Sequence, residues 1–223
     1  MKGFRWFLTV GLVVLGACTV ASLCGEGAKK APSAHEGDAT DVVVASLPGQ
    51  AAKRAPSPRD WDQWRGPTRN GLSSETDWTC KWPDMGPREL WRIKLAPGYS
   101  TVSVRNGLVY TNGGTFKDEM VCCLNARNGS EVWKFTFPAT PGSSWKWTRG
   151  PYATPSVDGA LVFAQSMSGY VVALDSYTGQ MVWGKGLVKE AGRTPPIYGY
   201  SSSPLVVDGL VIVSGGMGLE KRT

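Results

Sequence analysis

The sequence predicts an all-β fold of four-stranded antiparallel sheets. Its 28 glycines, 15 prolines and 10 tryptophans in 223 residues favour short strands joined by turns. A strand–turn–strand pattern, LNARNGSEVW at 124–133, returns as LDSYTGQMVW at 174–183. Upstream strand pairs also recur, and Leu108, Leu161 and Leu210 mark them at nearly equal spacing. Units of about fifty residues with four short strands and a repeated tryptophan are typical of β-propeller blades.

Each unit ends in a predicted β-hairpin. The apolar runs EMVCCL and GYVVAL lead into polar turns, and the alternating runs SEVWKF and QMVWGK follow them. Asn125 and Asp175 begin the turns, because their side chains can accept backbone N–H groups two residues on. Gly129 and Gly179 supply the positive φ that a four- or five-residue hairpin loop with a bulge needs. Upstream, SVRNGLVYT, SVDGALVFA and LVVDGLVIV each predict two further strands around a glycine turn.

Residues 1–24 are predicted to be an export signal or anchor. Lys2 and Arg5 precede the apolar stretch Trp6–Leu23. Within it, LGAC resembles a bacterial lipobox, in which the cysteine, here Cys18, receives lipid and becomes the mature terminus. Ordinary signal cleavage around residues 20 to 25 is an alternative, and an uncleaved anchor is another, because the apolar stretch approaches the lower length limit for spanning. All three place most of the chain outside the cytoplasm, in the periplasm or cell envelope.

Residues 25–60 are predicted to form a flexible linker, and residues 61–223 to form the propeller segment. The linker is rich in Ala, Pro, Ser and Lys and has little apolar surface to bury. The single histidine, His35, lies in the linker, which excludes most hydrolase triads. The net charge of +6 is scattered and forms no basic stripe with interleaved aromatics, so nucleic acid is not an expected partner.

The repeat resembles the tryptophan-docking motif A-x-D-x-x-T-G-x-x-x-W of quinoprotein-type propellers. ALDSYTGQMVW, residues 173–183, matches it at every defined position, whereas CLNARNGSEVW retains only Gly129 and Trp133. WDQWRGPTRNG and ELWRIKL are similar to the opening segments of exported members. The resemblance covers roughly residues 60 to 216 and implies an eight-bladed PQQ-like propeller. It also implies that indole rings pack between adjacent blades, which assigns this structural role to Trp91, Trp133 and Trp183.

The family resemblance implies two classes of function. Some members are dehydrogenases that hold pyrroloquinoline quinone (PQQ) and Ca²⁺ on the propeller axis, with a vicinal disulfide above the quinone. No segment here matches their calcium or catalytic motifs, and Cys122 and Cys123 sit within a predicted strand, so no catalytic, cofactor-binding or metal residue is assigned. Other members are enzymatically silent, among them the lipoprotein subunit of the outer-membrane β-barrel assembly machine.

We therefore expect an exported, non-enzymatic propeller segment that acts as a scaffold for an envelope protein or peptide. One alternative is a fragment of a PQQ-dependent alcohol or sugar dehydrogenase, with PQQ and calcium as its cofactors. A carbohydrate-binding surface protein is a second alternative. The expected ligand surface is a funnel rim formed by the loops that enter each innermost strand, and its residues are Tyr99, Tyr152, Tyr200, Trp145 and Trp147. Packing of the blade tops would explain the same tyrosines without a ligand.

The propeller is expected to be incomplete. Residues 61–223 have room for about three blade units, whereas closed propellers have at least four blades and this family has eight. Because blades stabilise one another only through their neighbours, an open arc exposes sheet edges. We expect a fragment of a longer protein; self-association into a ring or completion by another chain are the alternatives.

Overall fold

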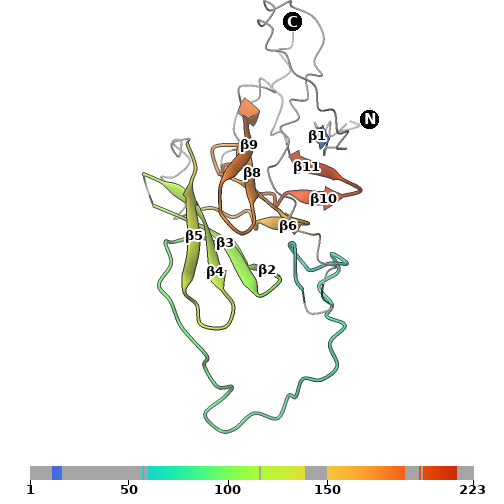
Figure 1. The fold of residues 1–223 in the computed structure, drawn as a ribbon, viewed down its shortest axis with the longest axis vertical. Helices are drawn as coiled ribbons and strands as arrows, with labels where there is room; N and C mark the ends of the chain where they lie inside the picture. The colour runs from blue at the N-terminus through green and yellow to red at the C-terminus, as the bar shows by residue number, and fades with distance from the viewer. Residues whose placement is uncertain are drawn as a thin grey trace, which may run out of the picture.

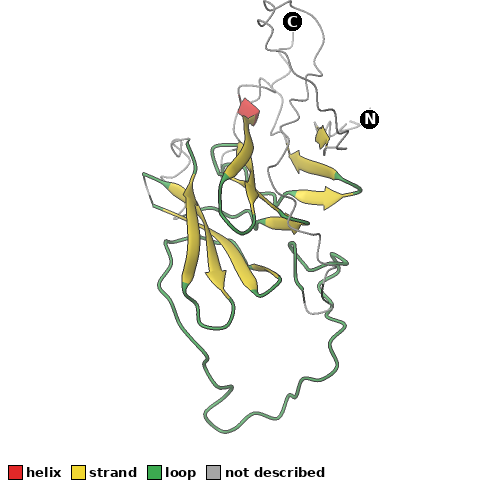
Figure 2. Cartoon of the chain, viewed as in Figure 1, coloured by secondary structure: helices red, strands yellow, loops and turns green. Residues whose placement is uncertain are grey.

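A computed structural model describes residues 12–16, 57, 60–115, 117–138, 150–188, 196 and 198–214, and for 12–16 it describes the backbone alone. Three antiparallel sheets follow one another along the chain (Figure 1). In the described part, helical residues occur only at 187 and 188, at the end of a strand (Figure 2). The prediction of an all-β fold built from four-stranded antiparallel units is confirmed.

The first two sheets are complete four-stranded blades. The first contains β2 (Ser103–Arg105), β3 (Leu108–Gly114), β4 (Glu119–Asn125) and β5 (Glu131–Thr136), in that spatial order. The second repeats the arrangement with β6 (Ser156–Asp158), β7 (Leu161–Gln165), β8 (Tyr170–Asp175) and β9 (Met181–Gly186). Both sheets shift register at the same step, after Cys123 and after Ala173. The repeated sequence therefore folds into a repeated structure, and the repeat includes the β-bulge.

The turns between the third and fourth strands form as their side chains predict. Asn125 Oδ1 accepts the backbone N–H of Arg127 at 2.9 Å, and Asp175 Oδ1 accepts that of Tyr177 at 3.0 Å. Gly129 and Gly179 both have a φ of 71°. L-residues with a Cβ rarely adopt this left-handed conformation, so glycine is needed at both places.

The third sheet combines distant parts of the chain. It contains β10 (Leu205–Val207), β11 (Leu210–Ser214) and β1 (Leu12–Gly16), in the order β1-β11-β10. β1 pairs antiparallel with β11, with Leu12 opposite Ser214 and Gly16 opposite Leu210. The sequence interpretation gave 12–16 only a role in export, and the structure adds a strand there. An apolar run can satisfy the open hydrogen bonds of an edge strand, which accounts for the pairing.

The core lies between the sheets. One buried cluster joins the first and second sheets and includes Tyr110, Val121, Trp133, Val162 and Val172. A second joins the second and third sheets and includes Phe163, Val171, Tyr200, Val211 and Val213. The first strands of the three sheets face one another, because β6 contacts both β2 and β10. In Figure 1, β5 and β9 lie on the far side of their sheets from these inner strands. This is the arrangement of blades around a propeller axis.

Residues 62–102 precede the first blade and contain no strand. Figure 1 shows this segment as a long loop that leaves the inner strands and returns beside the first sheet. Among the described residues, no helix has the length and apolar character needed to cross a membrane.

Candidate functional site

Indole rings connect successive units in a repeating way. A Cβ built on Gly129 would lie 2.6 Å from the ring of Trp91, and one built on Gly179 would lie 2.6 Å from the ring of Trp133. Trp91 Nε1 donates to the carbonyl oxygen of Ala126 at 2.9 Å, and Trp133 Nε1 donates to that of Ser176 at 3.0 Å. Each ring therefore lies flat against the glycine of the following turn and is fixed by one hydrogen bond.

The next tryptophan along the chain is placed differently. Trp183 in β9 is half-buried, and its ring centroid lies 6.2 Å from that of Phe163. Its contact is with the second sheet, to which it belongs, and with the cluster that joins the second and third sheets.

The inner edge of the blades is covered by the segment that precedes them. Trp61 forms an antiparallel bridge with Val104 of β2, with reciprocal backbone hydrogen bonds of 2.8 Å. One residue later, the carbonyl oxygen of Asp62 accepts the N–H of Val157 in β6 at 2.7 Å. The segment thus crosses from the inner strand of the first blade to that of the second. It satisfies part of both free edges on the axial side.

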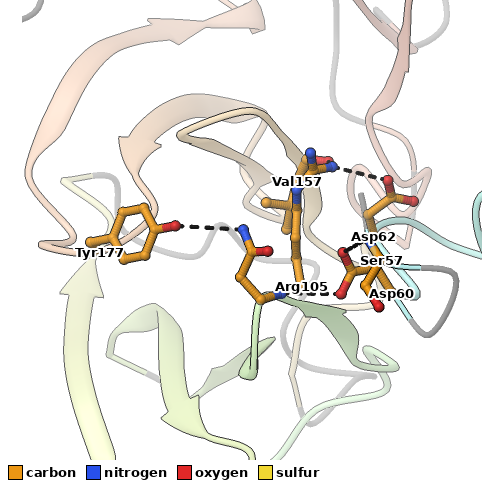
Figure 3. Close-up of polar contacts among 7 residues, drawn as sticks. Ser57, Asp60, Asp62, Arg105, Val157 and Tyr177 are labelled. Carbon is orange, nitrogen blue, oxygen red and sulfur yellow. Dashed lines mark hydrogen bonds and ion pairs between the residues drawn. The ribbon is translucent and has the colours of Figure 1, made fainter. Parts of the chain in front are cut away.

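A polar network fixes this axial segment (Figure 3). Asp60 is buried, and its carboxylate accepts the backbone N–H groups of Ser57 at 2.7 Å and of Asn106 at 3.1 Å. The side chain of Asn106 reaches the hydroxyl of Tyr177 on the second blade at 3.5 Å. The network therefore connects the axial segment to the turns of both blades.

The same network contains an ion pair between Arg105 and Asp62. Nη1 of Arg105 lies 3.2 Å from Oδ2 of Asp62, and the side chains are 6% and 15% exposed. Burial raises the pKa of Asp62 above its ordinary value, although the Arg105 guanidinium opposes the shift. Nε of Arg105 and Oδ1 of Asp62 are buried without a hydrogen-bond partner in the described part of the chain. The contacts of the ion pair therefore offset only part of the free energy that is lost when its two charged groups leave water.

A small pocket lies beside this ion pair at the inner edges of β6 and β10. Its volume is about 120 Å³, and its lining residues are Asp62, Gln63, Ser156, Val157, Asp158, Val206, Val207 and Asp208. The lining holds three carboxylates and no cationic side chain, and the Arg105 guanidinium beside the pocket pairs with one of them, that of Asp62. Within the described residues, no group of three or more His, Cys, Asp or Glu side chains is placed to hold a metal ion.

The pocket does not fit PQQ. That cofactor is a polycarboxylate, and its acid groups would face Asp62, Asp158 and Asp208. Of these three carboxylates, only that of Asp62 has a cationic partner among the described residues, Arg105, so those of Asp158 and Asp208 would repel the acid groups. Cys122 and Cys123 are buried free thiols within β4. Burial raises the pKa of both thiols, that of Cys123 to about 12, so both remain protonated.

Tyrosines gather at the opposite end of the inner strands. The rings of Tyr99 and Tyr152 stack with centroids 4.7 Å apart and an angle of 10° between their planes. The N–H groups of Tyr99 and Ser100 both donate to the carbonyl oxygen of Pro151, at 2.8 and 3.1 Å. Asn112 Nδ2 donates to the carbonyl oxygen of Ala153 at 2.8 Å. Hydrogen bonds between the two blades thus hold the stack in place.

The other predicted rim residues are not part of this stack. Tyr200 is 2% exposed and packs against Gly169, so it lies in the core below the surface and not on a rim. Trp145 and Trp147 fall outside the described residues, as does Cys18. Tyr198, which the sequence interpretation did not single out, is 60% exposed.

Glu119 is a buried carboxylate at the junction of the two blades. It begins β4, is fully buried, and both of its carboxylate oxygens accept the N–H of Met167 at 3.0 Å. Met167 lies in the turn between β7 and β8 of the second blade. Burial raises the pKa of Glu119 to about 7, although the hydrogen bonds from Met167 and Ser166 oppose the shift. The contact between the blades therefore contains a group that titrates near neutrality.

Replacing Glu119 with glutamine is expected to stabilise the protein above pH 8 and to have little effect below pH 4.5. The folded-state pKa of about 7 exceeds the ordinary value of 4.5. The contribution of Glu119 to the stability of the wild type is therefore fully present below pH 4.5 and is lost as the pH rises through 7, by about 3 kcal/mol. Denaturant unfolding across this range measures the effect. Glu131→Gln, at an exposed position, is the control. A parallel pH dependence of wild type and Glu119→Gln would contradict the assignment.

Sequence reasoning missed Asp62, Arg105 and Glu119. Their partners lie on segments 43 and 48 residues away, so no local spacing indicates the contacts. The one available signal was the pair of aspartates on either side of Trp61, which is unusual next to an apolar strand residue.

Part of the chain is similar to known proteins. Residues 117–219 match the family described as "Outer membrane protein assembly factor BamB". No curated protein matches the chain. Among solved structures, quinohemoprotein alcohol dehydrogenase ADHIIG from Pseudomonas putida HK5 is 27% identical, with a TM-score of 0.41 over 56% of this chain and 18% of that one.

Two further structures are similar to the chain. Quinohemoprotein alcohol dehydrogenase from Comamonas testosteroni is 19% identical, with a TM-score of 0.43 over 55% of this chain and 18% of that one. BamB from Moraxella catarrhalis is 18% identical, with a TM-score of 0.31 over 52% of this chain and 40% of that one. The chain thus spans less than half the length of each of these proteins. The two four-stranded blades and the repeated docking of tryptophan on glycine are those of a β-propeller, and the family match over 117–219 is consistent with PQQ-like repeats in that part of the chain.

Proposed function

We propose that this propeller segment acts in the cell envelope as a binding scaffold for another protein or peptide. The observation that carries the proposal is the stack of the exposed Tyr99 on the half-buried Tyr152, which hydrogen bonds between two blades hold in place. Rigid aromatic side chains with polar tips give large contact area at low entropic cost. The match to a family described as an outer membrane assembly factor supports a protein partner.

The position of the linker, residues 25–60, favours the end of the inner strands that carries Tyr99 and Tyr152 as the binding face. Tyr99 precedes β2, whereas Asn106 follows it and contacts Asp60, where the linker reaches the blades. The linker therefore enters at the end of the inner strands opposite the tyrosine stack. If residues 1–24 direct export and Cys18 carries lipid, the tyrosine stack faces away from the anchoring membrane. Processing at Cys18 would also remove β1 and leave the edge of β11 free.

A photo-crosslinking amino acid at position 99, introduced in living cells, tests the proposal. We expect a discrete adduct with an envelope protein from position 99 and none from position 177. Tyr177 is a matched control, because it is an exposed tyrosine in a turn at the other end of the blades. Absence of a protein adduct at position 99 would contradict the scaffold function. Retention of the chain on a polysaccharide, lost in Tyr99→Ala plus Tyr152→Ala, would favour a carbohydrate-binding function in its place.

The dehydrogenase alternative makes a different prediction. Addition of PQQ and Ca²⁺ to the purified chain would give saturable binding and dye reduction if these blades formed the cofactor site. The acidic lining of the axial pocket supports the opposite expectation, namely no saturable binding. Turnover with an alcohol or sugar would replace the scaffold proposal by an enzymatic one.

A further inference from the structure

A third exposed tyrosine lies beside the stack of Tyr99 and Tyr152. Tyr198 is 60% exposed and belongs to the loop before β10, as Tyr99 and Tyr152 belong to the loops before β2 and β6. Burial raises the pKa of the Tyr152 phenol, and the phenols of Tyr99 and Tyr198 add to the shift, so both lie within its electrostatic reach. These three residues, which we call the tyrosine row, therefore supply one phenol from the loop before each inner strand.

The described loops that carry the tyrosine row have no charged side chain. Their residues, 97–101, 150–154 and 198–203, are Gly, Pro, Ala, Ser, Thr and Tyr. The carboxylates of the axial pocket lie at the opposite end of the inner strands. A phosphate group or a charged peptide side chain would lose hydration on these loops without meeting an opposite charge, which is unfavourable. The tyrosine row therefore suits an uncharged partner.

Backbone N–H groups of these loops are already hydrogen-bonded within the protein. Those of Tyr99 and Ser100 donate to the carbonyl oxygen of Pro151, and that of Thr101 donates to Oγ1 of Thr154 at 3.2 Å. By contrast, the phenol hydroxyls of the tyrosine row have no hydrogen-bond partner among the described residues. The surface therefore offers its donors on aromatic rings, and it matches a partner rich in hydrogen-bond acceptors.

Two common modes of peptide recognition do not fit this surface. Strand addition needs free backbone groups on a sheet edge, whereas Trp61 bridges the inner edge of β2 and Asp62 bonds to that of β6. An amphipathic helix buries aliphatic anchors in an apolar groove. The large side chains that these loops expose, Tyr99 and Tyr198, end instead in polar hydroxyl groups.

A polyproline II segment matches the properties of the tyrosine row. Its backbone makes no internal hydrogen bonds, so its carbonyl oxygens are free to accept from tyrosine hydroxyls. Proline has no backbone N–H and therefore needs no acceptor from the surface. Its rings pack on aromatic side chains, and its restricted backbone loses little conformational entropy on binding.

We propose that the partner presents an uncharged, proline-rich segment in the polyproline II conformation to Tyr99, Tyr152 and Tyr198. This inference rests on the scaffold function proposed above and names the kind of segment that the scaffold binds. The aromatic rings supply the packing surface and the hydroxyls supply the donors. Loss of a ring should therefore weaken binding more than loss of a hydroxyl.

Titration of the full chain with a decaproline peptide with capped, uncharged ends, followed by NMR, tests the proposal. We expect saturable binding, with chemical-shift changes centred on the loops of the tyrosine row. Tyr198→Ala should weaken binding at least about tenfold, and Tyr99→Phe, which keeps the ring, by a smaller factor. Tyr177→Ala is the matched control, because Tyr177 is an exposed tyrosine in a turn at the other end of the blades. It should bind as the wild type does.

A peptide of glycine and serine of the same length measures the specificity for polyproline II and should not bind at the same concentrations. Wild-type amide signals of β6, β7 and β8 in Tyr198→Ala would show that its blades are folded. Absence of saturable decaproline binding, equal binding of the glycine–serine peptide, undiminished binding by Tyr198→Ala, or binding of a neutral polysaccharide in place of the peptide would each overturn the proposal. If a protein adduct from position 99 still forms in cells, the scaffold function stands and only the proline-rich partner is wrong.

Discussion

Replacing Trp133 with alanine is expected to lower the free energy of unfolding by about 3–5 kcal/mol, the cost of emptying a buried aromatic site. The ring is 8% exposed and belongs to the cluster that joins the first two sheets. Its removal also leaves the carbonyl oxygen of Ser176 without the indole donor at 3.0 Å. Because the lost contacts connect two blades, the loss should also reduce the cooperativity between them. Denaturant unfolding monitored by far-UV circular dichroism measures both effects.

The control for this variant is Trp78→Ala. Trp78 is 71% exposed in the loop before the first blade, so its removal should change stability little. Gly179→Ala provides a second check, because its Cβ would meet the Trp133 ring and its φ of 71° is strained for alanine. In the Trp133→Ala background the collision disappears, and only the strain remains. Additive losses in the double variant would contradict the docking contact.

The fold was largely predictable because its signals are local and repeated. Asn125 with Gly129, and Asp175 with Gly179, specify a turn within five residues, and alternating apolar residues on either side specify its strands. Tryptophan docking also has a sequence signal, because the ring and the glycine that it covers recur at blade spacing. Each of these features needs only one unit and its neighbour, so a pattern read along the chain can indicate them.

The polar contacts of the candidate site were not predictable in the same way. Tyr200 occurs in a loop that looks like those of Tyr99 and Tyr152, yet it is buried against Gly169 of the second blade. Whether a tyrosine at this position points outward depends on the turn of the neighbouring sheet, which differs between blades. The Arg105–Asp62 pair likewise depends on how the segment before the blades crosses the inner strands. Such contacts depend on how successive blades pack against one another, so the sequence of a single blade unit does not predict them.

Replacing Arg105 with methionine is expected to lower the free energy of unfolding at neutral pH by up to about 3–5 kcal/mol, because it leaves the partly buried carboxylate of Asp62 without its counter-ion. Arg105 is 6% exposed at its side chain, and its guanidinium also donates to the carbonyl oxygen of Val157 at 3.5 Å. The variant should release the axial segment, so amides that its pairing protects, those of Val104 and Val157, should exchange faster. Hydrogen exchange and denaturant unfolding measure the two effects. Arg92→Met, which removes an exposed ion pair with Glu89, is the matched control and should leave stability unchanged.

The pH dependence of the stability loss in Arg105→Met tests whether the carboxylate of Asp62, left without its counter-ion, causes that loss. Burial already raises the pKa of Asp62 in the folded protein, and loss of the opposing guanidinium raises it further. A carboxyl group whose folded-state pKa is raised costs stability in full above that pKa, and the cost disappears as the pH falls to the unfolded-state pKa. The deficit of Arg105→Met should therefore shrink on acidification, and Asp62→Asn should restore part of the lost stability at neutral pH. If Asp62→Asn adds to the loss, or the deficit is the same at acid and neutral pH, then Arg105 stabilises the axial segment by packing alone and the buried charge pair has no net role.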